Sequence, residues 1–241
     1  MPVTERYFQQ EDQYAVIHLP IRPNGFGVLY IGGNTHYVDN DQSCLLQHFD
    51  KRKLLSELTS EGYTVFTSNL YGKNWGSDDA VELAESLYHS VMRKEILNPS
   101  IHLIGEGTGA LVVCKLLSHL KDKVRSICLI NPSLNLKNEL DLERENKLFY
   151  KRTVHEILKA YKTTDLYSAV GRECFFYETI SPIKIYSTTR NHFKWKRDIR
   201  LLEDERNRNN LPISILISLE EKKFDCGSNL IKFLKKYQRL L

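Results

Sequence analysis

The sequence predicts an α/β fold, in which a mostly parallel sheet carries helices on both faces. Short apolar runs of strand length alternate with longer segments whose apolar residues recur at every third or fourth position. Glycine, proline and asparagine separate many of these segments, as turns require. Glycines also gather at one junction from strand to helix, Gly105–Gly109. A chain of 241 residues is long enough for such a fold, and we expect a single domain over residues 1–241.

The first elements predict a hairpin that leads into the parallel sheet. Residues 6–10 and 14–21 have the apolar and β-branched composition of strands. The turn signal RPNG at residues 22–25 follows them. A buried strand is then expected at 27–32, ending in two glycines, and the polar segment 34–41 predicts a loop.

The alternation continues towards the carboxyl end. The predicted strands are 63–68, 100–104, 124–130, 183–187 and 211–218, and the predicted helices are 43–60, 110–120, 196–206 and 229–240. A further helix is expected between Ser77, a good N-cap residue, and Asn98, which precedes a proline. In the helix that begins at residue 43, Phe49 is expected on the apolar face with Leu54, and Gly62 is suited to end the helix.

Residues 135–175 interrupt the alternation. The segment is first rich in charge and then has a helical apolar pattern that includes Leu148, Val154 and Leu158. We interpret it as a helical cap inserted into the domain, and the alternative is an ordinary pair of surface helices. The aromatic run Phe175–Tyr177 follows, and such a run lines a pocket or belongs to the core.

Composition excludes several classes of protein. The 34 basic and 30 acidic residues give a net charge of +4, which predicts a mixed solvated surface and no nucleic-acid partner. The five cysteines are far apart and odd in number, which argues against a disulfide framework or zinc site and fits a reducing, cytoplasmic compartment. No segment has the length or apolarity of a signal peptide or a membrane span. We expect no cofactor and no metal.

Three stretches carry a resemblance to a known family. Gly105–Gly109 (GEGTG) looks like a nucleophile elbow, G-x-S-x-G, at a junction from strand to helix. Tyr30–Asn34 (YIGGN) looks like the loop that supplies one oxyanion-hole N–H, and Gly72–Ser77 looks like a glycine-containing loop of the same family. In this order the three stretches, with the cap after the next strand, resemble the α/β-hydrolase superfamily over almost the whole chain.

The catalytic triad that this resemblance implies is missing at all three positions. Gly107 stands where the nucleophile belongs, and Gly has no side chain. The loop that holds the acid in the family contains Asn191 and no Asp or Glu before Asp198. Lys223 occupies the place of the histidine, and no histidine follows His192. Three independent losses predict that the serine-hydrolase mechanism is absent.

Other residues near the elbow remain candidates for a site. Glu106 is a candidate for proton transfer if burial raises the pKa of its carboxyl group. A pair of His36 and Asp39 at a pocket mouth is a second candidate for acid–base chemistry. The alternatives are a packing role for Glu106 and a solvent-facing His36. Thr108 follows the nucleophile position, where the family uses the backbone N–H. With Gly33 and Asn34, these residues define the expected pocket and oxyanion region.

The remaining chemistry-bearing residues favour less specific interpretations. His102 alternates within a strand, which is typical of a core histidine, and Cys226 is expected to be a free thiol near a helix start. His192, Lys194 and Trp195 are candidates to face the pocket from the acid loop. The glycines of the elbow are spaced i, i+2 and i+4, which differs from a dinucleotide fingerprint.

Three hypotheses for function follow. The first is a protein of this fold that has lost hydrolase chemistry and binds a small molecule or a protein. The second is a hydrolase or lyase, esterase-like, with a non-standard site that uses Glu106, His36 or Thr108, since fold alone does not determine function. The third is an interaction partner that uses the charged segment 135–172. The sequence identifies no ligand, no partner and no oligomeric state.

Overall fold

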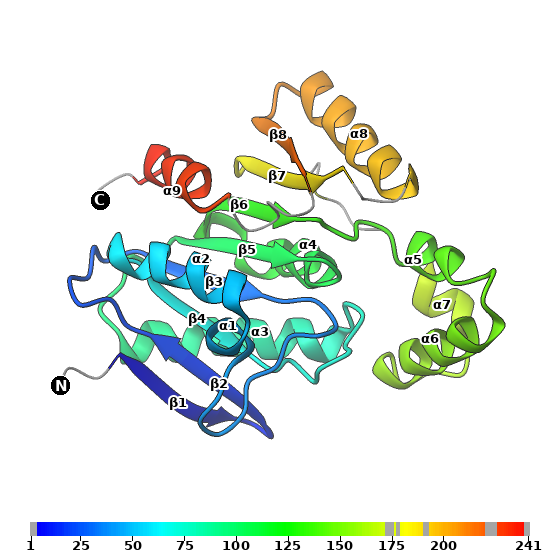
Figure 1. The fold of residues 1–241 in the computed structure, drawn as a ribbon, viewed down its shortest axis with the longest axis horizontal. Helices are drawn as coiled ribbons and strands as arrows, with labels where there is room; N and C mark the ends of the chain where they lie inside the picture. The colour runs from blue at the N-terminus through cyan, green and yellow to red at the C-terminus, as the bar shows by residue number, and fades with distance from the viewer. Residues whose placement is uncertain (1–3, 172–175, 177–178, 190–192, 220–225, 239–241) are drawn as a thin grey trace.

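Eight strands form one mostly parallel sheet with the order β1-β2-β4-β3-β5-β6-β7-β8 (Figure 1). The computed structural model describes residues 4–171, 176, 179–189, 193–219 and 226–238, without the side chains of 193–196. The strands are β1 (Glu5–Gln10), β2 (Gln13–His18), β3 (Gly27–Ile31), β4 (Thr64–Ser68), β5 (Ile101–Glu106), β6 (Val124–Ile130), β7 (Ile183–Thr188) and β8 (Ile213–Ser218). β1 and β2 form the predicted hairpin, and β2 pairs with β4 antiparallel. The other neighbouring strands run parallel, which confirms the predicted fold class.

Helices cover both faces of the sheet. The helices of the main body are α1 (Cys44–Gln47), α2 (Phe49–Ser60), α3 (Asp78–Lys94), α4 (Gly109–Leu120), α8 (Phe193–Arg208) and α9 (Gly227–Lys236). On one face, leucine, valine and isoleucine side chains of α3, α4 and α8 form a cluster with the sheet. On the other face, α2 and α9 form a second cluster (Figure 1). Two separate apolar cores therefore hold the sheet between helical layers, as expected for a parallel sheet.

The helix predicted over 43–60 is wrong in one respect, because it is broken into α1 and α2. His48 lies between them with an extended backbone, φ −87° and ψ 121°. The break changes which residues of α2 face the sheet. Phe49, expected on the apolar face, is 72% exposed, whereas Lys51 is 4% exposed.

Smaller differences concern element ends. β2 stops at His18, although the strand was expected to continue to residue 21. Pro20 interrupts that segment, because proline has no N–H to donate to a neighbouring strand. Gly62 has φ +92°, and its backbone N–H bonds the Thr59 carbonyl, as expected for a glycine that ends α2.

Three helices follow β6 and lie beyond one end of the sheet (Figure 1). They are α5 (Leu136–Leu142), α6 (Lys147–Ala160) and α7 (Leu166–Val170). Their buried side chains form a third cluster that also includes Trp75 and Leu111 of the main body. The Tyr161 hydroxyl bonds the carbonyl oxygens of Trp75 and Gly76, each at 3.1 Å. We call this helical segment the cap. It rests on the loop that leads into α3.

Of the aromatic run that follows the cap, Phe176 belongs to the core of the sheet, and Phe175 and Tyr177 lie outside the described residues.

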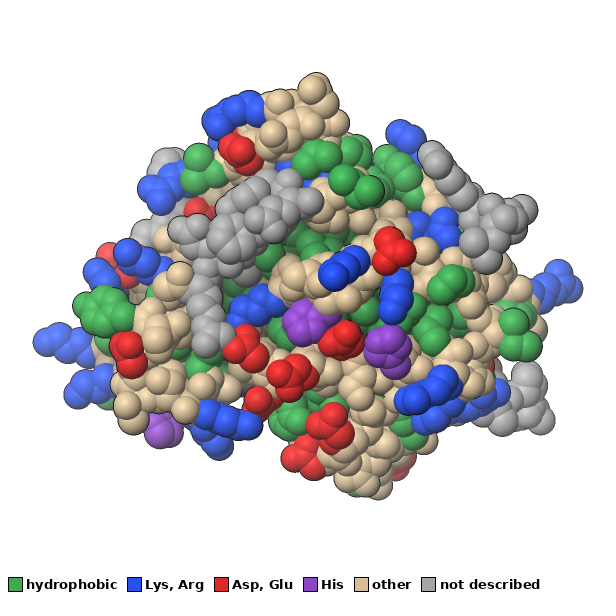
Figure 2. Space-filling view, turned by 180° about the vertical axis from the view of Figure 1, so that it is seen from behind, with side chains coloured by type: hydrophobic (Ala, Val, Ile, Leu, Met, Phe, Trp, Pro, Cys, Tyr) green, Lys and Arg blue, Asp and Glu red, His purple; other side chains and the backbone are tan. Residues whose placement is uncertain are grey.

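Surface charge is mixed in sign. Figure 2 shows acidic and basic side chains interspersed over the face that is turned away in Figure 1. Ion pairs between α3 and α4 include Lys115–Asp78 at 3.0 Å and His119–Glu85 at 2.7 Å. Four buried cysteines of the described ranges form no disulfide, namely Cys44, Cys114, Cys128 and Cys226, and Cys174 lies outside these ranges. Within the described ranges, no helix combines the length and the apolarity that crossing a membrane needs.

Candidate functional site

The turn between β5 and α4 places Gly107, the residue at the expected nucleophile position, at its centre. Gly107 has φ +54°, a conformation that side-chain-bearing residues rarely adopt. Its N–H donates to the Ile130 carbonyl at 3.0 Å, and its carbonyl accepts from the Ser133 N–H at 2.9 Å. These two bonds anchor the elbow to the end of β6. A Cβ at position 107 would find Gly33 Cα as its nearest neighbour, at 3.9 Å. The elbow therefore has room for a side chain that the sequence does not supply.

The flanking glycines have a different role, which is close packing of helix on sheet. A Cβ at Gly109 would collide with the carbonyl oxygen of Ile31 and lie 2.6 Å from that of Gly32. A Cβ at Gly105 would lie 2.9 Å from Val113 of α4. Because α4 crosses β3 and β5 at these points, any side chain there would push the helix off the sheet.

The loop after β3 lies against the elbow. A Cβ at Gly33 would be 3.2 Å from the Glu106 carbonyl oxygen and 3.5 Å from the Thr108 nitrogen. The Thr108 hydroxyl donates to Asn34 Oδ1 at 3.0 Å, which ties the loop to the start of α4. Within the part of the chain that the structure describes, the N–H groups of Asn34 and Thr108 have no acceptor. Two neighbouring free donors at a helix N-terminus favour a negatively charged or strongly polar oxygen.

Glu106 points away from the elbow, into the core beneath α2. Its Oε2 accepts a hydrogen bond from the Tyr30 hydroxyl at 2.6 Å and forms an ion pair with Lys51 Nζ at 2.7 Å. All three side chains are buried. Burial and the adjacent Glu106 carboxylate raise the pKa of Tyr30 well above its usual value, so its proton stays on the hydroxyl. This arrangement fits the packing interpretation of Glu106 better than a catalytic one.

His36 is buried and does not pair with Asp39, so the expectation that it faces solvent is wrong. Its side chain is 5% exposed and packs on Gly32, and its Nε2 is 2.8 Å from the Thr67 hydroxyl. Asp39 is exposed, and its carboxylate accepts from the backbone N–H of Asn40. Burial, together with the nearby Lys51 cation, lowers the pKa of His36 to about 3, so the ring is neutral at pH 7. The short loop buries His36 because Gly32 leaves space for the ring.

The structure also locates the other candidates. His102 is a core histidine, as expected, with Nδ1 2.7 Å from the Ser126 hydroxyl. Cys226 is a buried cysteine outside any disulfide at the N-cap of α9, near a helix start as expected. Asn191, His192 and Lys223 lie outside the described residues, as do the side chains of Lys194 and Trp195. No three His, Cys, Asp or Glu side chains of the described ranges are grouped so that they could hold a metal ion.

Sequence reasoning missed Lys51 as a partner of Glu106. Lys51 precedes Leu54, Leu55 and Leu58 by three, four and seven residues. That spacing places all four on one helix face, and the buried Lys51 side chain is consistent with it. A lysine within an apolar stripe is a signal for a buried carboxylate partner. Tyr30 lies in the strand predicted to be buried, where its hydroxyl requires a partner, and Glu106 is that partner.

Comparisons with known proteins find similarity in structure and not in sequence. No family model matches the chain, and no curated protein matches it. Among solved structures, an esterase from Pyrococcus furiosus matches with a TM-score of 0.69 and 13% identity, over 98% of this chain and 91% of that one. Est1E from Butyrivibrio proteoclasticus matches with a TM-score of 0.66 and 9% identity, over 98% and 99%. An esterase of the bacterial hormone-sensitive lipase family matches with a TM-score of 0.64 and 15% identity, over 98% and 86%. At these identities the likeness concerns the fold alone.

Proposed function

Because the chain has the α/β-hydrolase fold but no side chain at residue 107, we propose that it is a binding protein that has lost serine-hydrolase chemistry. Its ligand is a small molecule with a carboxylate or similar oxyanion, held at the elbow. The observation that carries this proposal is the elbow itself, which keeps φ +54° and open space at a position where the chain supplies no nucleophile.

Substitute catalytic groups near the elbow are already engaged elsewhere. Acid–base catalysis needs a group within hydrogen-bond reach of the substrate and with a pKa near the working pH. Glu106 is held by Tyr30 and Lys51 in the core, and His36 is buried against Thr67 with a pKa of about 3. These contacts support a structural role for both residues.

Binding at the elbow rests on backbone donors and on the helix. The Thr108 nitrogen would lie 3.5 Å from a Cβ at Gly33, and the Thr108 hydroxyl holds Asn34 close by at 3.0 Å. The helix α4 contributes the positive end of its dipole. In an esterase such donors stabilise the oxyanion that forms during acyl transfer. Without a nucleophile the same donors suit a stable carboxylate, which is the product of ester hydrolysis.

A matched pair of variants at Thr108 tests this site, with butyrate as the probe. Thr108 has φ −65°, which a proline adopts, so Thr108→Pro removes the N–H with little change of backbone. Thr108→Val keeps the N–H and removes the hydroxyl. We expect ligand-detected NMR to show butyrate binding to the wild type and to Thr108→Val, and no binding to Thr108→Pro. Equal binding by all three proteins, with matching thermal melts, would contradict the elbow as the site.

The loss of hydrolysis is tested with p-nitrophenyl esters of two to eight carbons. We expect no turnover by the wild type above the uncatalysed rate, with a serine esterase as positive control. The second candidate, a hydrolase or lyase with a non-standard site, is favoured by the esterases among the structural neighbours. Saturable turnover that disappears in Thr108→Val would establish that candidate and overturn the proposed loss of catalysis.

A further inference from the structure

A cavity that contains none of the elbow residues lies between α2 and the amino-terminal hairpin. Its volume is about 640 Å³, within the size range of small-ligand sites. Leu46 and Leu55 line the cavity from α1 and α2, and Pro20 and Ile21 line it from the segment after β2. Ile21 is 80% exposed, so the cavity opens to solvent at this side.

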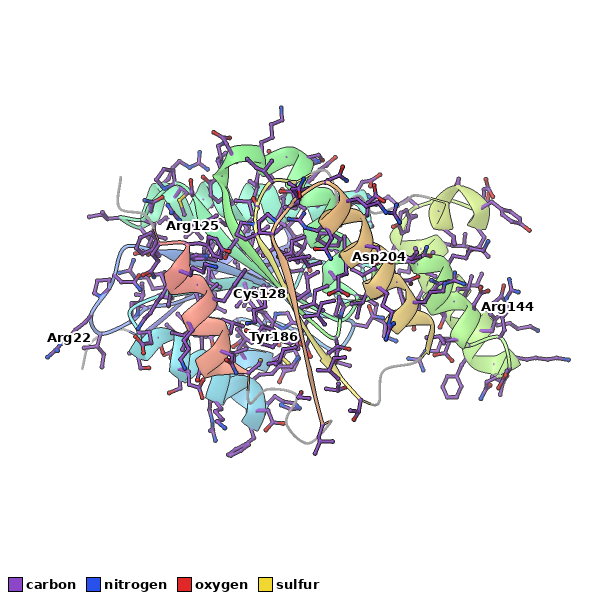
Figure 3. The ribbon with its side chains drawn as sticks, turned by 90° about the horizontal axis from the view of Figure 1, so that it is seen from above. Arg22, Arg125, Cys128, Arg144, Tyr186 and Asp204 are labelled. Carbon is purple, nitrogen blue, oxygen red and sulfur yellow. The ribbon has the colours of Figure 1, made fainter. Side chains whose placement is uncertain are left out.

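The position of the cavity separates it from the proposed elbow site. His18, which lines it, is opposite Val65 at the beginning of β4, because β2 runs antiparallel to that strand. The elbow follows the end of β5, which is parallel to β4 through β3. The cavity therefore lies at the amino-terminal end of the parallel strands, and the elbow lies at their carboxyl-terminal end. Figure 3 shows Arg22, another lining residue, at one end of the molecule and Arg144 of the cap at the other.

His18 is an unusual group to find in such a wall. It is 2% exposed, and neither ring nitrogen has a hydrogen-bond partner among the described residues. A buried polar atom without a partner costs free energy, and natural proteins rarely keep two on one side chain. Burial lowers the pKa of His18 to about 4, so at pH 7 the ring offers one N–H donor and one acceptor nitrogen. A polar ligand atom in the cavity would supply the missing partner.

Two guanidinium groups stand at the same cavity. Arg22 and Arg52 both line it and are exposed, and neither is paired with a carboxylate in the described ranges. The Arg52 guanidinium lies 6.0 Å from the centre of the Phe49 ring. Glu5 is the acidic residue in the lining, and it accepts a hydrogen bond from the Thr4 hydroxyl at 2.7 Å. The charge of the lining is therefore +1, with His18 neutral, which favours an anion at the mouth.

We infer that this cavity is a second binding site, which takes an organic monoanion with an apolar body. The anionic group bonds Arg22 and Arg52 at the mouth, the body packs on Leu46 and Leu55, and a polar atom beside the anion bonds His18. The inference is independent of the proposed function, since it uses none of the elbow residues.

The probe is 8-anilinonaphthalene-1-sulfonate, which has a sulfonate, an aromatic body and an adjacent N–H, and becomes fluorescent in apolar sites. We expect saturable binding to the wild type. Arg22→Gln/Arg52→Gln should weaken binding about tenfold or more, since a hydrogen bond to a charged group contributes that much. Ser56→Trp, at an exposed lining position on α2, should abolish binding by filling the cavity. Arg144→Gln in the cap is the matched control and should bind as the wild type does.

Each outcome decides the inference once thermal melts confirm that the variants are folded. Absence of saturable binding to the wild type overturns it, as does unchanged affinity in Ser56→Trp. Loss of binding in Ser56→Trp with unchanged affinity in the double arginine variant overturns the choice of an anion. Parallel loss in both, with the Arg144→Gln control unaffected, supports it.

Discussion

Gly107 and Gly109 are two residues apart in one turn, yet the structure favours glycine at them for different reasons. At Gly107 the preference is conformational, since φ is +54° while the space beyond is open. At Gly109 the requirement is steric, because the carbonyl oxygens of Ile31 and Gly32 occupy the place of a Cβ. The sequence motif predicted the turn from both glycines alike. The different roles depend on how α4 approaches β3.

Alanine at each position separates the two requirements. Gly107→Ala should cost about 1 kcal/mol of unfolding free energy, which is the usual penalty for a left-handed residue. Gly109→Ala should cost about 3 kcal/mol, because backbone oxygens cannot move aside without shifting α4. Urea denaturation at 25 °C measures both. An equal cost for the two variants would mean that the space at Gly107 is filled.

At the scale of elements, the Lys51–Glu106 pair fastens α2 to the end of β5. The two side chains are 5% and 9% exposed, and their ion pair measures 2.7 Å. A buried pair gains little over apolar packing, but the removal of one partner leaves a buried charge. The pair also holds Glu106 away from the elbow, so the contact that joins the two elements keeps a carboxylate out of the proposed site.

Lysine-to-methionine variants compare the contribution of this buried ion pair to the free energy of unfolding with that of an exposed ion pair. Lys51→Met should destabilise the protein by about 3 kcal/mol, since the Glu106 carboxylate stays buried without its cation. The control is Lys235→Met, which breaks the 2.6 Å pair of Lys235 with Glu61, where both side chains are about half exposed. It should cost less than about 1 kcal/mol. In Lys51→Met/Glu106→Gln we expect part of the stability to return, and a further loss would argue against charge burial as the cause. Chemical denaturation gives all three values.

At the scale of the whole molecule, three buried histidines make stability depend on pH. Burial lowers the pKa of His18 to about 4, and of His36 and His102 to about 3, against about 6.5 in the unfolded chain. Between these values the unfolded chain binds protons that the folded protein excludes. Protonation therefore favours unfolding, and stability falls as the pH falls below about 6.5.

We expect the free energy of unfolding to decrease by several kcal/mol between pH 7 and pH 4.5, measured by urea denaturation at fixed ionic strength. His102→Asn removes one of the three groups and should flatten the profile between pH 6.5 and 4.5. The matched control is His155→Asn, at an exposed position on α6, which should leave the slope unchanged. The same slope in His102→Asn as in the wild type would contradict the assignment to buried histidines.

The sequence by itself determined the fold class, the hairpin and the elbow turn. These follow from local signals, which are the period of the apolar residues and the glycines at positions that need φ above zero or close packing. The absence of a nucleophile at residue 107 is likewise a fact of the sequence. Such features need only neighbours along the chain, so periodicity and turn chemistry predict them.

The tertiary structure alone decided where Glu106, His36, Lys51 and His18 point. Each is a polar residue whose partners, or lack of them, depend on segments distant in sequence, as in the contact of Lys51 with Glu106 and of His36 with Thr67. The break at His48, which exposes Phe49 and buries Lys51, depends on how α1 and α2 pack on the sheet. Whether a titratable side chain is catalytic or structural is set by burial and long-range contacts, which local sequence patterns do not contain.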